Sequence, residues 1–298
     1  MKQELIKKIQ NAAVDMMSKV VFEEDGHTYK RVSDGVWLQG VSEVSSIIPK
    51  DWLSAWGAKE AVKFLGYSDY EEDTERAKEI FEKIQLLGNI REDGEGIKSY
   101  IALLKEAKGA SFRKSKEALV DGKKGHDWLE TYCKTKIRGT ELPKVPTDAL
   151  KRPIEQFIDW EKGNVAQWVL SEARVAYPEK EYAGTMDGMA IMKDGKLAVI
   201  DFKFASHISE DYYLQTAGYQ HCFDPYEIPI DQRIIVRLPK TLEIDEWDKK
   251  ERKYKKIENK IEVKIVDTPY TFDRDTFLHM LPVKKWINYM KKNGSKNS

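Results

Sequence analysis

The stretch KLAVIDFKFAS, residues 196–206, constrains the fold of this chain more than any other segment. Its apolar residues lie on both faces of an extended chain, which is typical of a central strand covered on each side. Two charged residues, Asp201 and Lys203, interrupt this apolar run. A lone charge in such a place costs several kcal/mol or is neutralised through a shifted pKa. Asp201 and Lys203 must therefore pair with each other or with a third group.

A second predicted strand, YAGTMDGMAIM at residues 182–192, precedes this segment. The connection is Lys193-Asp194-Gly195, which suits a three-residue hairpin loop with Gly195 in the left-handed conformation. We therefore predict an antiparallel hairpin formed by these two strands.

The register of that hairpin places charged residues together. Met192 pairs with Lys196, so Asp187 lies directly opposite Asp201, and Lys203 shares their face two residues along. A two-residue loop would instead put the two carboxylates on opposite faces. The three-residue loop predicts two carboxylates and a lysine at one point of the sheet.

Two carboxylates held this close repel each other unless a proton or a cation lies between them. Mg²⁺ or Mn²⁺ suits such a place because these ions take oxygen ligands and retain water molecules. Lys203 beside such a centre can stabilise developing negative charge or help to orient and deprotonate a water. This arrangement suits phosphodiester hydrolysis. The pattern leaves one alternative open, a buried Asp–Lys ion pair with Asp187 in a turn.

The rest of the chain indicates an α/β fold with a mixed central β-sheet flanked by helices. An N-terminal hairpin region is indicated by the turn signals Asp25-Gly26 and Asp34-Gly35. Further strands are predicted at residues 165–177, 232–239 and 261–267, and helices at 1–20, 111–136, 147–160 (capped by Thr147), 209–222 and 273–290, with a helical lobe over about 50–108.

Composition excludes several classes of protein. The 298 residues carry equal numbers of basic and acidic residues, 50 each, so bulk charge does not recruit nucleic acid. Two cysteines, Cys133 and Cys222, are too few for a disulfide scaffold, a zinc knuckle or a four-thiolate iron–sulfur cluster. No apolar run approaches the roughly 20 residues that cross a bilayer, and the charged first 20 residues do not resemble a signal peptide. We expect a cytoplasmic protein of a bacterial or phage-infected cell.

The motifs GTMD, then IDFK after a hairpin, then a helix containing QTAGY, resemble the PD-(D/E)XK nuclease superfamily, in its RecB-like and phage exonuclease branch. Residues 122–126 fit the Gly-x-x-x-His pattern of that branch, and Glu172 fits its upstream strand glutamate. The early segments HTYKR and GVSEVSSII resemble the N-terminal hairpin and helix start of phage members. The resemblance covers most of residues 20–225 and is loose in the C-terminal quarter.

The resemblance implies a restriction-endonuclease-like core. The chain would be a single nuclease domain over residues 1–298, in which the lobe at about 50–108 elaborates a core formed by about 20–49 and 109–298. Mg²⁺ or Mn²⁺ would be the cofactor. The implied metal ligands are Asp187, Asp201, the carbonyl of Phe202, and His126, and the implied catalytic residues are Lys203, Asp187, Asp201 and Glu172.

Two of these assignments have structural alternatives. His126 can be a polar helix residue beside Trp128, and Glu172 can pair with Arg174 or a nearby lysine. Two residues depart from the nominal motif, since Met186 replaces its proline and Asp201 stands where many members have Glu; the branch accepts both. The missing cysteine cluster excludes the iron–sulfur members.

DNA contacts are also implied. Gln215 and Tyr219 lie on one helical face, which in the family borders the active site and touches the DNA strand; the alternative is an ordinary buried helix face. The segment KKERKYKK at residues 249–256 is either a solvated hairpin tip or a clamp on phosphates. The other candidates are the basic residues Arg113, Lys114, Lys116, Lys123 and Lys124, and the aromatic residues Trp52, Trp56 and Tyr67, which form either a stacking wedge or core.

The function that follows from the resemblance is a metal-dependent DNA nuclease, an exonuclease of DNA recombination, repair or phage replication. Its partners would be single- or double-stranded DNA and a single-strand annealing or recombination protein, as for some phage exonucleases, with no membrane. A structure-specific endonuclease or an RNA-directed nuclease uses the same core. The alternative of another class is a non-cutting accessory protein that binds DNA or a recombination partner.

Overall fold

The computed structural model describes residues 2–26, 28–67, 74–89, 95–248 and 253–294. The chain divides into two compact units. The first unit comprises Met1–Ile48, Gly122–Ile244 and Glu258–Ser298, and the second comprises Pro49–Asp121 and Asp245–Ile257. Each unit is described by itself below.

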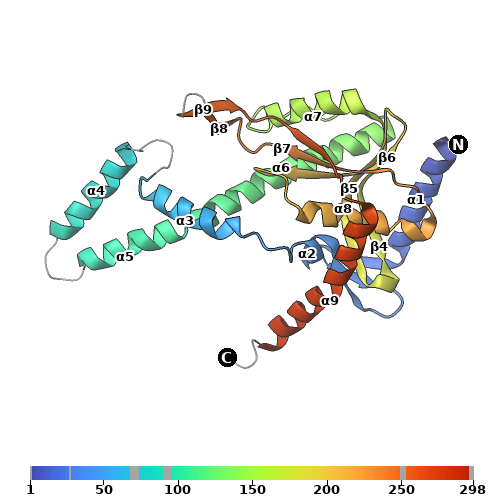
Figure 1. The fold of residues 1–298 in the computed structure, drawn as a ribbon, viewed down its shortest axis with the longest axis horizontal. Coiled ribbons are helices and arrows are strands. Elements are labelled where there is room, and N and C mark those ends of the chain that lie inside the picture. The colour runs from blue at the N-terminus through green and yellow to red at the C-terminus, as the bar shows by residue number, and fades with distance from the viewer. Residues whose placement is uncertain (1, 27, 68–73, 90–94, 249–252, 295–298) are drawn as a thin grey trace. The chain divides into compact units, whose positions relative to one another are not determined.

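The first unit is built on an eight-stranded sheet in the order β1-β2-β3-β5-β6-β7-β10, with β4 paired to β5 (Figure 1). The pairs β3–β5 and β6–β7 are parallel and the other pairs are antiparallel, which confirms the predicted mixed sheet and N-terminal hairpin. The strands are β1 (Val20–Glu23), β2 (Thr28–Arg31), β3 (Trp37–Gly40), β4 (Val165–Tyr177), β5 (Tyr182–Met192), β6 (Leu197–Phe204), β7 (Gln232–Leu238) and β10 (Glu262–Ile265).

The β5–β6 hairpin has the predicted register. Gly188 pairs with Ile200, and Met192 donates its N–H to the carbonyl of Lys196 at 2.8 Å. Gly195 has a φ of +88°, the left-handed conformation that the three-residue loop requires. Continued by one residue, this register sets Asp187 against Asp201.

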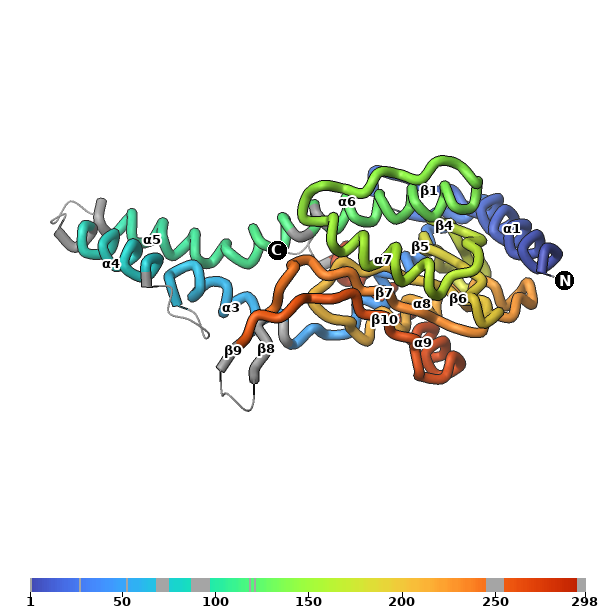
Figure 2. The backbone as a smooth tube through the Cα atoms, turned by 90° about the horizontal axis from the view of Figure 1, so that it is seen from above, coloured from blue at the N-terminus to red at the C-terminus, as the bar shows by residue number. Residues whose placement is uncertain are grey.

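Helices cover both faces of this sheet, and a hydrophobic core fills each interface (Figures 1 and 2). One core joins the sheet to α1 (Lys2–Ser18), α2 (Val41–Ser45), α8 (Asp211–His221) and α9 (Tyr270–Gly294). The other joins it to α6 (Ala110–Arg138) and α7 (Lys151–Asn164). Strand β6 contributes to both, since Val199 lies in the first core and Ile200 in the second. This confirms β6 as a central strand covered on each side.

The start of α7 differs from the prediction that Thr147 caps this helix. The helix begins at Lys151, and the Asp148 side chain accepts the N–H of Leu150 at 3.0 Å. Pro153 then lies in the first turn, where its missing N–H costs no helical hydrogen bond. The prediction was wrong because this aspartate holds a tight turn after Thr147.

The second unit contains the predicted helical segments. They are α3 (Trp52–Phe64), α4 (Thr74–Asn89) and α5 (Glu95–Lys108), together with the first turns of α6. Strands β8 (Glu243–Asp248) and β9 (Lys253–Glu258) form a two-stranded sheet. Residues 249–252 of the basic segment KKERKYKK lie outside the described residues. Among the helices that the structure describes, none is long and apolar enough to cross a membrane.

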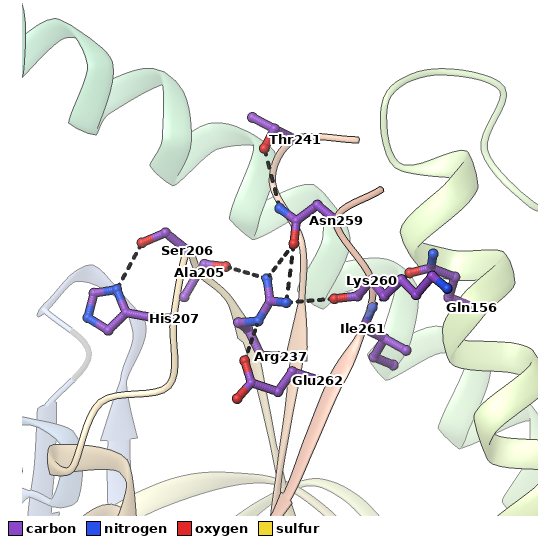
Figure 3. Close-up of polar contacts among 10 residues, drawn as sticks. All are labelled: Gln156, Ala205, Ser206, His207, Arg237, Thr241, Asn259, Lys260, Ile261 and Glu262. Atoms are coloured by element: carbon purple, nitrogen blue, oxygen red, sulfur yellow. Dashed lines mark hydrogen bonds and ion pairs between the residues drawn. The ribbon is translucent and has the colours of Figure 1, made fainter. Parts of the chain in front are cut away.

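A buried arginine ties the end of β6 to its neighbours (Figure 3). Arg237 on β7 is 6% exposed and donates to the carbonyls of Ala205 at 3.3 Å and Lys260 at 2.6 Å. It also donates to the Asn259 side chain and forms an ion pair with Glu262 at 3.0 Å. The guanidinium of Arg237 thus fixes the backbone at Ala205, two residues after Lys203.

We predict that Arg237→Lys lowers the free energy of unfolding by about 2–4 kcal/mol, because an ammonium cannot reach these acceptors together. The measurement is chemical denaturation of the parent and the variant. Arg152→Lys is the matched control, since Arg152 also pairs with a glutamate, Glu258, but is 55% exposed; little change is expected there. Equal loss of stability in both variants would contradict the role given to the buried fork.

Candidate metal centre

Three carboxylates form a row across three neighbouring strands. The flanking pairs of the β4–β5 ladder, Ser171–Gly188 and Ala173–Met186, leave Glu172 facing Asp187. The β5–β6 ladder ends at the pair Gly188–Ile200, next to Asp187 on β5 and Asp201 on β6, and the charges of these two carboxylates interact. Each carboxylate comes from a different strand, so the sheet itself fixes their spacing.

The middle of this row is held by short polar contacts. Asp187 Oδ2 accepts the backbone N–H of Phe202 at 2.6 Å. Lys203 Nζ lies 2.8 Å from Asp201 Oδ1 and 2.7 Å from Asp201 Oδ2. Asp201 Oδ2 is fully buried, and its contact with Lys203 lacks hydrogen-bond geometry, so it accepts no hydrogen bond from the described residues. The predicted Asp–Lys pair is present, and Asp187 lies in a strand rather than in a turn.

A histidine from α6 completes the cluster. One ligand atom each of His126, Glu172 and Asp187 lie within 4.8 Å of one another. The imidazole of His126 also meets the Phe204 ring edge-on, with centroids 5.5 Å apart. Two ligand atoms bound to one hard cation are at most about 5 Å apart, so this spacing is compatible with a shared ion.

Glu172 has an uncommon backbone conformation. Its φ is +46°, in the left-handed region, although it lies inside a strand and is not glycine. Such a conformation costs about 1–3 kcal/mol and persists where surrounding structure enforces it, often at functional sites. Arg174, the alternative partner for Glu172, instead stacks over the Phe22 ring at 4.2 Å. The local distortion presents the Glu172 carboxylate to Asp187 and His126.

The electrostatics of the row favour a positive partner. Burial and then the neighbouring Asp187 charge raise the pKa of Glu172 to about 8. Burial raises the pKa of Asp187, and it raises that of Asp201 to about 6, in both cases against the opposing effect of Lys203. Desolvation therefore outweighs the one lysine that is present. A cation among these groups would restore their ionised forms.

The two basic groups of the cluster, Lys203 and His126, have pKa values shifted in opposite directions. Burial lowers the pKa of Lys203, but the charges of Asp201 and Asp187 outweigh burial and leave its pKa above the usual value. Burial and then the Lys203 charge lower the pKa of His126, so its imidazole is neutral and has a lone pair to donate. Lys203 is thus a fixed positive charge and His126 a potential ligand.

The donor set fits a hard divalent cation. It offers carboxylate oxygens from Glu172, Asp187 and Asp201, one neutral imidazole, and no thiolate. The buried Asp201 Oδ2 has an unused lone pair, which a cation can take. Of the predicted ligands, the structure brings together His126 and Asp187 with the predicted catalytic Glu172, and it places Asp201 beside them on β6.

The predicted helix face on α8 lies against the sheet. Tyr219 is 3% exposed and accepts a hydrogen bond from the Gln215 side chain at 3.0 Å. Burial raises the pKa of Tyr219 well above its usual value, with further contributions from Asp201 and Asp187. Gly184 of the GTMD motif lies beneath Tyr219, and a Cβ there would come within 2.8 Å of the ring. This face of α8 therefore packs against β5 close to the carboxylate row.

The basic candidates are exposed. Lys123 and Lys124 are exposed on α6 just before His126, in the first unit, and Arg113 is exposed on the part of α6 that belongs to the second unit. Arg113 donates to the carbonyl of Glu106 at 2.8 Å and lies over the Phe64 ring. In the second unit, Trp56 is half-buried and Tyr67 is exposed.

Two neighbours of the site were not predicted from the sequence. Tyr212 on α8 has its ring 5.0 Å from Lys203 Nζ, a cation–π distance. Glu130 on α6 is one turn after His126, and its charge adds to that of Asp187 in raising the pKa of Glu172. Helical spacing could have indicated both residues. Tyr212 lies three residues before Gln215 and Glu130 lies four residues after His126, so each shares a helical face with a predicted site residue.

Comparison with known proteins finds a likeness among solved structures. No protein-family model matches the chain, and no curated protein matches it. Among solved structures, the chain is similar to the crystal structure of LHK-Exo in complex with dAMP. The identity is 14%, the match covers 58% of this chain and 86% of that chain, and the TM-score is 0.26.

A glycine beside His126 allows α6 to approach β6. A Cβ on Gly125 would lie 2.1 Å from Phe204 Cζ, whereas one on Gly122 would lie 3.7 Å from Phe204 Cβ. The close approach therefore depends on Gly125 and not on Gly122, the glycine of the predicted pattern. Phe204 is 8% exposed and part of the core.

We predict that Gly125→Ala destabilises the protein by about 1–3 kcal/mol, because the added methyl overpacks the Phe204 contact. Gly122→Ala is the matched control on the same helix; alanine favours helix there and stability is expected to be equal or higher. The measurement is denaturant unfolding of both variants. Loss of stability in the control but not in Gly125→Ala would contradict the packing.

Proposed function

We propose that this protein is a metal-dependent phosphodiesterase that acts on DNA, and specifically an exonuclease. The observation that carries the proposal is the row of Glu172, Asp187 and Asp201 on three adjacent strands, with Lys203 paired to one end. The motifs GTMD and IDFK, which resemble those of the PD-(D/E)XK nucleases, support the same chemistry.

Mg²⁺ or Mn²⁺ is the cofactor that we propose for this row. When bound, it would lower the pKa of a water and neutralise charge on the scissile phosphate. Asp187 and Asp201 would hold it together with His126 and the carbonyl of Phe202, and Glu172 would orient the water or complete the shell. The short bond from the Phe202 N–H to Asp187 fixes that carboxylate before any ion arrives.

Lys203 has an electrostatic role in this proposal. Its raised pKa keeps the ammonium charged at neutral pH, so it stabilises negative charge on a phosphate rather than accepting a proton. Asp201 positions the ammonium at 2.7–2.8 Å, and the centroid of the Tyr212 ring lies 5.0 Å from it. The side chain is 17% exposed, so it can reach a substrate from a largely buried position.

DNA would be bound without reading its sequence. Lys123 and Lys124 are exposed within one turn of His126 and are the nearest predicted phosphate contacts on the same helix. Arg113 belongs to the second unit and stays a prediction, as does contact of Gln215 and Tyr219 with DNA. The low exposure of Gln215 and Tyr219 favours a supporting role for them.

The experiment that tests the function is digestion of a 5′-labelled and a 3′-labelled DNA duplex, with Mg²⁺ or Mn²⁺ and with chelator. An exonuclease releases labelled mononucleotides from one end first and is inactive with chelator. Internal fragments as first products would identify an endonuclease, and parallel digestion of RNA tests the RNA-directed alternative. No cleavage with either metal would contradict the proposal and favour the non-cutting accessory protein.

We predict that Asp187→Asn and Lys203→Met each reduce cleavage by about 10²–10⁴-fold, because each removes a charge that acts on the reacting phosphate. Asp194→Asn and Lys196→Met are the matched controls, since both residues lie at the far end of the same hairpin and are about half exposed. Parent-level cleavage by both Asp187→Asn and Lys203→Met would exclude this row as the active site.

A further inference from the structure

A carboxylate that the proposed cleavage does not use is buried between two helices and the sheet. Glu161 on α7 is 3% exposed, and its side chain accepts hydrogen bonds from two other elements. Trp168 Nε1 on β4 donates to Glu161 Oε1 at 3.0 Å. From α6, the Tyr132 hydroxyl and Lys136 Nζ donate to Glu161 Oε2 at 3.2 Å and 3.3 Å. One buried carboxylate therefore joins α6, α7 and β4.

The indole of Trp168 packs against both strands that carry the aspartates. A Cβ on Gly188 of β5 would lie 2.9 Å from Trp168 Cζ3, so the ring rests directly on the Gly188 backbone. On β6 the ring packs against Phe202, with ring centroids 6.1 Å apart. Phe202 is also the residue whose backbone N–H donates to Asp187 at 2.6 Å. The position of this indole thus bears on the backbone around Asp187.

The place of Gly188 in the sheet extends this effect to the whole carboxylate row. A continuous rung across β4, β5 and β6 is formed by Ser171, Gly188 and Ile200. On each strand, the neighbour of the rung residue toward the same end of the sheet is one member of the row, Glu172, Asp187 or Asp201. The Trp168 ring therefore rests on the middle of a rung that lies one residue from all three carboxylates.

The hydrogen bond to Glu161 fixes the orientation of this ring. An indole N–H can only donate, and a buried donor without an acceptor costs free energy. Trp168 pairs with Ala190 on β5, which pairs in turn with Ala198 on β6. Two methyl groups restrain a large ring less than branched side chains do, so the ring would turn if its acceptor were removed.

The same carboxylate also ties the helix of His126 to the strands. Tyr132 is 1% exposed and lies six residues after His126 on α6. Because Tyr132 and Trp168 donate to different oxygens of Glu161, α6 and β4 are held to one buried group. The candidate ligand on α6 and the candidate ligands on the strands therefore share one anchor.

We propose that Glu161 is a positioning residue for the candidate metal centre and acts through the Trp168 indole. The inference rests on the proposed function and deepens it, since the groups that it positions are the candidate ligands. Loss of the Glu161 carboxylate would let the indole turn, and the backbone at Gly188 and Phe202 would follow. Metal binding depends on the residues that orient the ligands nearly as much as on the ligands themselves, so the affinity for a divalent cation should fall.

The experiment is calorimetric titration of full-length variants with Mn²⁺, with denaturant unfolding of each variant alongside. Glu161→Leu and Trp168→Phe should each bind Mn²⁺ about 10–100-fold more weakly than the parent. Glu161→Gln keeps a side-chain oxygen that can accept the indole N–H and should retain most of the parent affinity. This rescue by the conservative variant identifies the hydrogen bond as the cause.

Two control variants separate positioning from stability. Ile154 on α7 is fully buried, so Ile154→Ala should lower the denaturation midpoint and leave Mn²⁺ affinity unchanged. Trp160→Phe makes the same ring substitution in a half-buried residue next to Glu161 and should bind Mn²⁺ like the parent. Circular dichroism checks that each variant is folded, and if Glu161→Leu is not, the comparison of Trp168→Phe with Trp160→Phe decides.

Equal Mn²⁺ affinity in the parent and in Trp168→Phe would overturn the inference and leave the proposed function standing. The inference is also overturned if Ile154→Ala weakens Mn²⁺ binding as much as Trp168→Phe does, because lost stability alone would then explain the effect. A parent that binds no Mn²⁺ would overturn the proposed function together with the inference.

Discussion

The desolvated row of carboxylates across β4, β5 and β6 is the constraint on which the rest of the first unit depends. Three acidic groups on adjacent strands, with one lysine, raise the energy of the folded state unless their charges are compensated. The raised pKa values of Glu172 and Asp201, about 8 and about 6, express that cost. A chain that served only to form this fold would be more stable with apolar residues here. The energetic cost of the row supports the proposal that these residues have a functional role.

Packing and hydrogen bonds around β6 fix the positions of these charged side chains. Phe202 packs among Phe157 and Trp168 on the face opposite Asp201, so β6 cannot shift along its neighbours without losing aromatic contacts. Gly125 lets α6 approach closely enough for His126 to join the cluster. Beyond Lys203, the buried Arg237 fork fixes the end of the same strand. Rigidity at these points would hold the candidate ligand atoms in place, as the proposed metal site requires.

Much of this arrangement could be predicted from the sequence, because it depends on local rules. The Lys193-Asp194-Gly195 loop and strict alternation along two strands determine the register that opposes Asp187 and Asp201. Most helix and strand positions also follow from periodicity, and the start of α7 is an exception.

What could not be predicted depends on contacts distant in sequence. The left-handed backbone of Glu172 has no local signal, because glutamate rarely adopts it and tertiary packing imposes it. The need for glycine at position 125 rather than 122 becomes clear only when Phe204 is in place. Thr147 has the composition of a cap, but the Asp148 turn displaces the helix start. The meeting of Glu172 and Asp187 with His126 was implied by the family resemblance alone, because no local pattern in the sequence indicates it.

The central claim is that the row binds a divalent cation, and calorimetric titration of the full-length chain with Mn²⁺ tests it most directly. The structure predicts saturable binding by the parent and by Asp194→Asn, whose charge lies at the far end of the hairpin. It predicts loss of that binding in Asp187→Asn, because the middle carboxylate of the row is removed. Equal Mn²⁺ binding by the parent and Asp187→Asn, or no binding by the parent, would contradict the claim.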